Sequence, residues 1–207
     1  MNILFWFLKV VVWLPIAILF PTHIKNRKKF VKGKAIVIAN HQSNLDPILM
    51  ANYFWRRMIY LAKKELMNNK LTKWFFGKKF GAIPVNRQSV DVSTIKDALR
   101  TLKDNKTLVI FPEGGRREDS FSDDIKNGTA MFALKTGAPI VPMFFVKKPA
   151  LFRFNKLIID DPIYLDESLV GNASKENIQL VSNMIEAKML DMKEKYSKKK
   201  KDKKSRT

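Results

Sequence analysis

The chain has 207 residues, 46% of them hydrophobic, which is enough for one domain with a buried core and short appendages. It has no cysteine and only two histidines, so disulfides and thiolate chemistry are excluded and a multi-histidine metal site is disfavoured. The formal net charge of +20 favours polyanionic partners, which are nucleic acid, an anionic membrane surface or phosphorylated substrates.

The N-terminal segment, residues 3–20, is apolar with Lys9 as its one charged residue, and it is just long enough to span a bilayer. Lys9 and Pro15 weaken a simple spanning helix, so a shallow or re-entrant anchor fits equally well. A signal peptide is disfavoured because a basic start and a small-residue cleavage site are missing. Residues 23–34 carry six Lys/Arg and no acid, which predicts a cytoplasmic face for the domain that follows.

The next elements alternate between strand and helix patterns. Residues 34–40 are rich in β-branched side chains and predict a buried strand. A polar turn follows, in which Asp46 at the N-cap and Pro47 at the first helical position predict a helix over residues 47–64. A second helix, rich in Trp, Phe and Lys, is expected over residues 68–80.

The second half of the chain continues this alternation. The expected strands are a short strand or loop over residues 81–87, a buried strand at 107–111, a strand at 139–146 interrupted by Pro142, and a further candidate at 156–160. The expected helices cover residues 91–105, residues 131–135 with Gly137 as the C-cap, and residues 174–196.

This alternation predicts a single α/β domain with a mostly parallel or mixed central sheet flanked by helices, preceded by an N-terminal membrane-anchoring helix. We place the anchor and its basic flank at residues 1–30 and the domain at residues 31–196. The last fifteen residues carry nine Lys/Arg against two acids, so residues 197–207 are expected to be a disordered basic tail.

Three loops after expected strands carry the candidate site, because α/β proteins place their sites in such loops. In the first loop, His41 is a candidate general base near neutral pH. Asp46 would fix the tautomer of the ring and stabilise the imidazolium, as in a base–orienter pair. The five-residue spacing requires a turn between strand and helix. The alternative makes His41 a turn residue and Asp46 an ordinary N-cap.

The other two loops carry candidate anion-binding residues. In the sequence FPEGGRR, the glycine at Gly114 lets the backbone approach an anion and Arg116 can grip phosphate. Glu113 would orient the arginines or accept a substrate hydroxyl. In the third loop, Arg87 ends the segment GAIPVNR. A solvated turn and a surface arginine are the alternatives for these two loops.

The order of these segments over residues 30–145 resembles the glycerolipid acyltransferase family, the lysophosphatidate acyltransferases in particular. The family's motifs are matched here by NHQSNLDP, GAIPVNR, FPEGGR and APIVPMFF, and KNGTAMFA is similar to the helix that leads to the last of them. Gly115 stands where the family has threonine. The resemblance implies that His41 deprotonates the acceptor hydroxyl, that Asp46 holds the ring and that Pro142 shapes the acyl or acceptor site. It also implies a set of residues for the glycerol-phosphate, namely Arg87, Glu113, Gly114 and Arg116.

The implied activity is transfer of a fatty acyl group from acyl-CoA or acyl-carrier protein to the sn-2 hydroxyl of 1-acyl-sn-glycerol-3-phosphate, giving phosphatidic acid. No cofactor and no metal are implied. Glycerol-3-phosphate or another lyso-lipid as acceptor stays an alternative, as does a non-catalytic protein that binds anionic lipid. Nucleic acid is disfavoured as the main partner because the positive charge gathers beside the anchor and in the tail.

Overall fold

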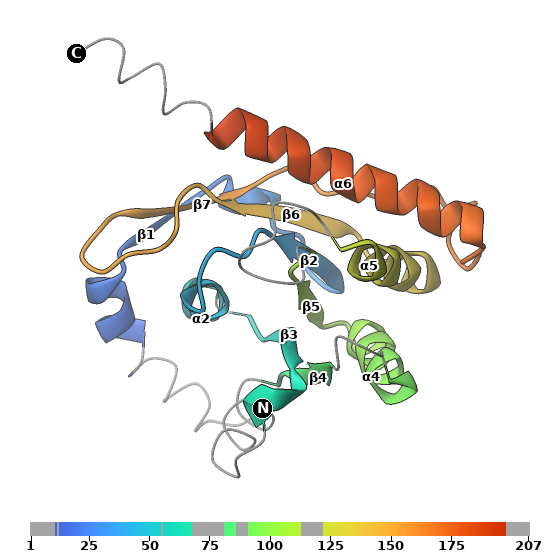
Figure 1. Cartoon of the computed structure of the whole chain (residues 1–207), viewed down its shortest axis with the longest axis horizontal. Helices are drawn as coiled ribbons and strands as arrows, with labels where there is room; N and C mark the ends of the chain where they lie inside the picture. Colours follow the sequence, from blue (N-terminus) through green and yellow to red (C-terminus); the bar gives the residue numbers. More distant parts are fainter. Residues whose placement is uncertain are drawn as a thin grey trace.

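The computed structural model describes residues 11, 13–54, 56–67, 81–85, 91–112 and 122–197. Its centre is a seven-stranded sheet with the order β1-β7-β6-β2-β5-β3-β4 (Figure 1). The strands are β1 (Thr22–Lys25), β2 (Ala35–Ala39), β3 (Met58–Lys63), β4 (Ile83–Val85), β5 (Thr107–Ile110), β6 (Ile140–Phe145) and β7 (Asn155–Ile159).

The five strands β2 to β6 are mutually parallel, whereas β7 is antiparallel to β6 and pairs in parallel with β1. In the centre of the sheet, Val37 of β2 lies opposite Val109 of β5 and Val141 of β6. The prediction of an α/β domain with a mixed sheet is therefore confirmed.

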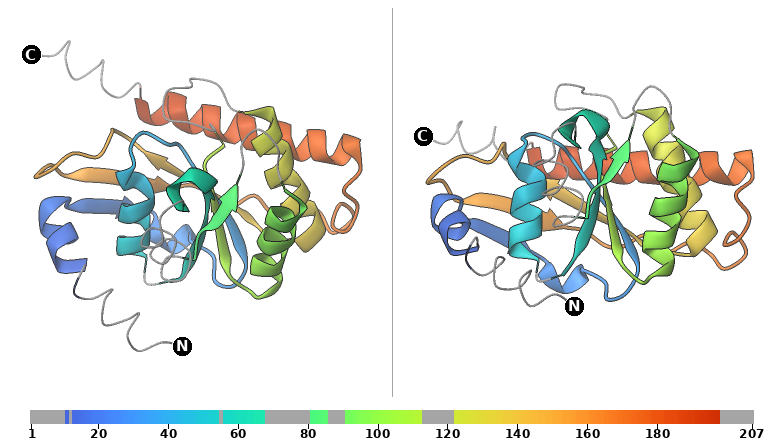
Figure 2. Two further views of the ribbon diagram at one scale, coloured as in Figure 1. Left: turned by 60° about the horizontal axis from the view of Figure 1, so that its bottom comes forward. Right: turned by 90° about the horizontal axis from the view of Figure 1, so that it is seen from below.

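Helices cover both faces of the sheet, as Figure 2 shows from two further sides. The helices are α2 (Leu45–Tyr53), α4 (Val92–Lys103), α5 (Asp123–Thr136) and α6 (Lys175–Ser197), with short 3-10 turns η1 (Arg27–Lys29) and η2 (Lys64–Met67). Side chains of α4, α5 and α6 pack in one apolar cluster, and those of α2 and residues 16–20 pack in another.

The central strands are buried because they face helices on both sides. Ile36 and Ile38 of β2 point into the cluster of α4, α5 and α6, whereas Val37 points into the cluster of α2. Every residue of β2, β5 and β6 is buried. This two-sided burial explains why these segments are continuous apolar runs without polar alternation.

The prediction of one helix over residues 47–64 is wrong. The helix α2 ends at Tyr53, and Met58–Lys63 forms the strand β3 between β4 and β5. Periodicity cannot separate a buried strand from a buried helix in so short an apolar run, and here pairing with β5 decided the outcome. The short edge strand β1 was not predicted either, since its sequence lies in a basic segment.

Other predicted elements are confirmed. They are the strands now seen as β2, β4, β5, β6 and β7, and the helices α4, α5 and α6. Gly137 ends α5 with a φ of 60°, the left-handed conformation of a helix C-cap. The predicted helix over residues 68–80, most of the predicted tail and the first ten residues lie outside the described part of the chain. Among the described residues, no helix is long and apolar enough to cross a membrane.

Candidate active site

The two candidate catalytic residues flank a turn at the carboxyl edge of the parallel strands. His41 follows β2 after Asn40, and Asp46 lies in the first turn of α2. Phe111 directly follows β5, the neighbour of β2, so the loops after two adjacent parallel strands meet at this edge. This is the edge at which open α/β sheets bind their ligands.

His41 and Asp46 form a direct pair, with 3.0 Å between Nδ1 and Oδ2. The backbone N–H groups of Gln42 and Ser43 donate to the same oxygen, each over 2.7 Å. A carboxylate oxygen that accepts two backbone N–H bonds carries no proton of its own. The hydrogen between Oδ2 and Nδ1 is therefore on Nδ1, and His41 donates it. In the neutral ring the lone pair then lies on Nε2, the nitrogen that can take up a proton.

Asp46 is completely buried, whereas the His41 side chain keeps 14% of its surface exposed. Oδ1, the second carboxylate oxygen of Asp46, has no hydrogen-bond partner within the described ranges. A buried carboxylate is costly to maintain unless it is well bonded, which is the condition that the three donors at Oδ2 provide. The His41 side chain thus keeps some exposed surface, whereas the carboxylate that orients it has none.

The prediction that Asp46 is the helix N-cap is wrong. Asn44 occupies the N-cap position of α2, and it makes no capping bond with its side chain. An N-cap side chain accepts from the N–H groups that follow it, but Asp46 accepts from residues before it. Its carboxylate therefore folds the turn back onto His41, and the ordinary capping role does not describe it.

Asn40 ties this turn to the end of β6. Its Nδ2 donates to the carbonyl of Phe145 over 3.0 Å, and its Oδ1 accepts from the N–H of Phe145 over 2.7 Å. Gln42 Nε2 donates to the same carbonyl over 3.0 Å. The sequence reasoning assigned no role to Asn40. The sequence signal that could have indicated a role was the polar residue directly after a run predicted to be a buried strand. In the structure Asn40 is itself buried, with 3% of its surface exposed.

Phe111 supports the ring of His41 from the neighbouring loop. The two rings are stacked, with centroids 4.4 Å apart and an angle of 29° between their planes. The FPEGGR motif therefore begins in contact with the candidate base. The predicted binding residues of that motif and of the GAIPVNR segment lie outside the described residues, so their roles stay predictions: Arg87, Glu113, Gly114 and Arg116.

Pro142 lies inside β6, opposite Ile38 of β2. Its carbonyl accepts from the N–H of Asp160, beyond the last paired residue of β7. The missing N–H of proline therefore falls where the β6–β7 ladder ends, which is why the strand tolerates it. These are the contacts of a sheet residue, and the role predicted for Pro142 at the acyl or acceptor site stays a prediction.

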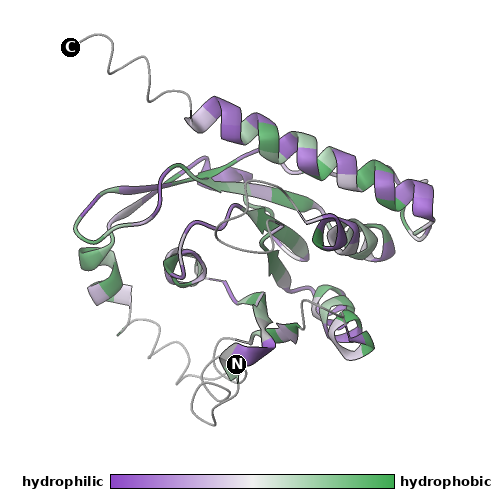
Figure 3. Ribbon diagram, in the orientation of Figure 1, coloured by the Kyte–Doolittle hydropathy of each residue, from purple (hydrophilic) through white to green (hydrophobic). Residues whose placement is uncertain are grey.

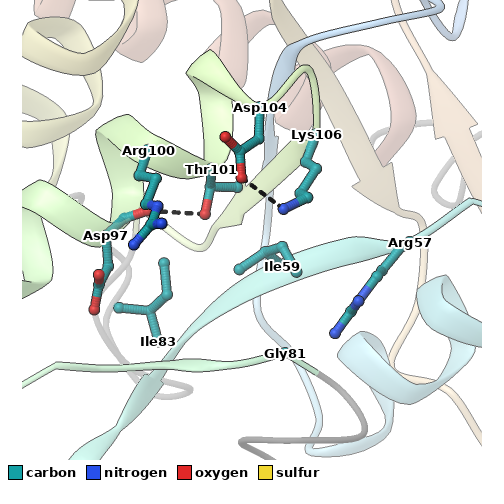
Figure 4. Close-up of a pocket in the computed structure, with 9 residues that line it drawn as sticks. All are labelled: Arg57, Ile59, Gly81, Ile83, Asp97, Arg100, Thr101, Asp104 and Lys106. Atoms are coloured by element: carbon teal, nitrogen blue, oxygen red, sulfur yellow. Dashed lines mark hydrogen bonds and ion pairs between the residues drawn. The ribbon is translucent and has the colours of Figure 1, made fainter. Parts of the chain in front are cut away.

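A recess of about 370 Å³ lies at the opposite, amino edge of the sheet (Figure 4). Arg57, Gly81 and Lys106 line it from positions just before β3, β4 and β5. Its polar groups are bonded locally, since Thr101 donates to the Asp97 carbonyl and Lys106 pairs with Asp104. None of the predicted site residues lines this recess.

A further charged cluster ties α5 to α6. The buried Lys126 of α5 bonds Glu186 of α6 over 2.6 Å and Asp123 over 2.9 Å. Burial alone would lower the pKa of Lys126, but these two carboxylates hold it above its ordinary value.

No group of three His, Asp or Glu side chains suited to a metal ion occurs in the described part of the chain, and the expectation of no metal stays a prediction.

Comparison with known proteins agrees with the motif order. Residues 21–146 match the sequence model of the Acyltransferase family. The chain is 30% identical over 179 residues to 1-acyl-sn-glycerol-3-phosphate acyltransferase of Bacillus subtilis, a match that covers 83% of this chain and 88% of that protein. It is 29% identical over 156 residues to the protein of that name from Streptococcus pneumoniae, covering 73% of this chain but 57% of that protein.

A solved structure shares the fold. The crystal structure of the 1-acyl-sn-glycerophosphate acyltransferase from Thermotoga maritima matches with a TM-score of 0.60 and 23% sequence identity, over 83% of this chain and 72% of that chain. Because residues 21–146 match the family model and the Bacillus subtilis relative is 30% identical over most of both chains, the chain belongs to the acyltransferase family.

Proposed function

We propose that this protein transfers a fatty acyl group to the sn-2 hydroxyl of 1-acyl-sn-glycerol-3-phosphate, giving phosphatidic acid for phospholipid biosynthesis. The observation that carries the proposal is the pair formed by His41 Nδ1 and Asp46 Oδ2 at 3.0 Å, at the carboxyl edge of the sheet. The names of the relatives from Bacillus subtilis and Streptococcus pneumoniae support the same reaction and acceptor.

In the proposed reaction, Nε2 of His41 takes the proton of the acceptor hydroxyl as its oxygen attacks the thioester carbonyl. The carbon–sulfur bond then breaks, the acyl group stays on the acceptor oxygen, and the thiol leaves with the proton from the imidazolium. Asp46 accepts from Nδ1 throughout and stabilises the positive ring. The stacked ring of Phe111 keeps the imidazole in its plane.

The acceptor's phosphate would be held by the loops after the neighbouring strands. We propose Arg87 and Arg116 as its charged partners, with Glu113 and Gly114 completing the cradle. Pro142 would shape the wall of the acyl or acceptor site from β6. The donor would be acyl-CoA or acyl-carrier protein, with no cofactor. The enzyme would work at the cytoplasmic face of the cell membrane, held by residues 1–30 and its basic segments.

The direct test is acyl transfer by the purified protein in mixed micelles, with radiolabelled acyl-CoA or acyl-carrier protein and 1-acyl-sn-glycerol-3-phosphate. We expect His41→Ala to lower turnover by about 100- to 10,000-fold, the usual loss for a positioned base. The matched control is His23→Ala, because His23 is the other histidine of the chain and lies exposed on β1. It should keep wild-type turnover.

Glycerol-3-phosphate and other lyso-lipids are offered in parallel as acceptors. Transfer to one of them in place of 1-acyl-sn-glycerol-3-phosphate would keep the role of His41 and replace the proposed acceptor. Equal turnover of wild type and His41→Ala would overturn the proposed base. Absence of transfer to every acceptor with both donors would favour the alternative of a non-catalytic protein that binds anionic lipid.

A further inference from the structure

The loop that joins β6 to β7, residues 146–154, exposes three large apolar side chains. Leu151 is 54% exposed, Phe152 72% and Phe154 86%. Single exposed apolar residues are common on protein surfaces, but two phenylalanines and a leucine within four residues form an exposed apolar patch. We call this segment the hairpin loop.

Hydrogen bonds within the hairpin loop and at its end fix its conformation. Asn155, which is buried, accepts from the N–H of Ala150 with its side chain and donates to the carbonyl of the same residue. Arg153 donates to the carbonyl of Lys148 over 2.6 Å. Phe152 has a φ of 51°, a left-handed conformation that is strained for a bulky side chain. Strain of this kind persists only where the surrounding structure fixes the backbone, so the loop holds Phe152 in one exposed position.

A second exposed apolar surface lies directly beside this loop. The N–H of Phe152 donates to the carbonyl of Leu19 over 2.7 Å, at the end of the helix over residues 13–19. That helix exposes Leu14 and Ile18, by 56% and 60%. Figure 3 shows the helix and the loop next to each other. Together they make one apolar surface contributed by segments far apart in the sequence.

The charge around this surface has one sign. Lys147, Lys148, Arg153 and Lys156 are exposed on or beside the hairpin loop. The sequence has no acidic residue between Asp124 and Asp160, and none before Asp46. Exposed aromatic side chains among lysines and arginines are the composition that binds at the interface of an anionic bilayer. An acidic protein partner would satisfy the cations, but it would leave the phenylalanines without a matching apolar phase.

We propose that the hairpin loop inserts Leu151, Phe152 and Phe154 into the headgroup boundary of an anionic phospholipid bilayer, beside the helix over residues 13–19. The loop leaves the sheet directly after Phe145, the residue whose backbone Asn40 and Gln42 bind next to His41. Docking through the loop therefore sets the candidate base at the lipid surface. The choice of a bilayer as occupant rests on the proposed function, but insertion itself is measured without acyl transfer.

A single environment-sensitive label tests insertion locally, whatever else holds the protein on the membrane. The chain has no cysteine, so Phe154→Cys gives one labelling site, and Leu180→Cys on the exposed face of α6 gives a matched control. The probe is a vesicle of equal parts phosphatidylglycerol and phosphatidylcholine, with a nitroxide-bearing lipid as quencher. We expect the label at position 154 to brighten, shift to the blue and be quenched, and the label at position 180 to stay as in water.

Equal responses at the two positions, or an aqueous spectrum at position 154 with protein bound to the vesicles, would overturn the proposal. An apolar spectrum at position 154 without vesicles would assign the loop to a second copy of the chain and would also overturn it. Because the readout needs no substrate, a protein that fails to transfer acyl groups can still show insertion.

A vesicle-binding measurement gives the contribution of the two phenylalanine rings to membrane affinity. Phe152→Asn combined with Phe154→Ser removes both rings, and asparagine accepts the left-handed backbone at position 152. Vesicle affinity should fall by roughly tenfold or more, since each ring buries apolar area at the interface. Leu180→Ser with Met184→Ser removes two exposed apolar side chains of α6 and should leave affinity unchanged. Unchanged turnover of the loop variant in detergent micelles would separate docking from catalysis, and equal affinities of the two variants would refute the loop's role.

Discussion

The two edges of the sheet hold buried or partly buried charge in different ways. At the carboxyl edge, Asp46 is bound by backbone N–H groups and by the ring of His41 through Nδ1. Toward the amino edge, Asp160 is bound by the ammonium groups of Lys29 and Lys188, at 3.5 and 3.4 Å. Both carboxylates are nearly inaccessible, so burial does not distinguish them.

The partner distinguishes them. The ammonium groups of Lys188 and Lys29 pair with the Asp160 carboxylate and tie α6 and η1 to the sheet. An imidazole has a second ring nitrogen that can accept or donate a proton, so the partner of Asp46 is the candidate group for proton exchange with a substrate. The partner of each buried carboxylate therefore indicates the site of chemistry better than the recess at the amino edge does.

Replacing the Asp46 carboxylate should give the largest effect. In Asp46→Asn the amide no longer stabilises a positive imidazole, and we expect turnover to fall by about 100- to 10,000-fold with the fold retained. The matched control is Asp104→Asn at the amino-edge recess, where the hydrogen bond from Lys106 holds the pKa of an exposed Asp104 carboxyl below its usual range. Turnover of that variant should stay within about twofold of wild type. Similar losses in both variants would remove the contrast between the edges.

The second prediction concerns the hydrogen bonds that hold the turn with His41 and Asp46 in place. Asn40→Ala removes both hydrogen bonds to Phe145 and leaves a buried N–H without its acceptor. We expect the free energy of unfolding to fall by about 2–3 kcal/mol, with turnover lowered as His41 loses its fixed position. Urea denaturation of this variant is compared with Asn183→Ala, which removes an exposed acceptor on α6 and should cost less than about 0.5 kcal/mol. An unchanged midpoint for Asn40→Ala would show that the turn is held elsewhere.

The sequence predicted the central sheet because its signals are local. Residues 35–39, 107–110 and 140–145 are dense in β-branched and apolar side chains, and each run is short and bounded by polar or turn residues, which favours a buried strand. This reasoning failed for β3 because its apolar residues continue the apolar sequence of α2. Only the pairing of β3 with β5 shows where the helix ends and a strand begins. The strand β1 failed because it is short and basic and is defined by its partner β7.

The candidate pair was predictable for the same reason. The spacing of His41 and Asp46 requires a turn, and a turn between strand and helix lets the two side chains meet. The role of Asn40 was not predictable, because it depends on Phe145, more than a hundred residues away in the sequence. The stacking of Phe111 on His41 depends likewise on the neighbouring order of β2 and β5. Long-range pairing, which no local pattern encodes, thus sets the details of the site.

The smallest expected effect is a pH dependence at the amino edge. Burial alone would raise the pKa of Asp160, but the N–H of Asp161 and the ammonium of Lys188 hold it below its ordinary 3.8. A carboxyl whose pKa is lower in the folded than in the unfolded protein stabilises the fold above its unfolded pKa, and this contribution is lost as the pH falls through the folded value. Asp160→Asn should therefore cost about 1–2 kcal/mol at pH 7 and progressively less below about pH 4.

Urea denaturation of wild type and variant between pH 7 and pH 2.5 measures this difference. Asp161→Asn is the matched control, because its side chain is 70% exposed and its bond to Lys29 lies at the surface. Its effect should be below about 0.5 kcal/mol across the range. A cost of Asp160→Asn that stays constant down to pH 2.5 would mean that the lysines do not stabilise this carboxylate. The amino edge would then owe its stability to packing alone, and the contrast with the His41–Asp46 pair at the carboxyl edge would lose its electrostatic basis.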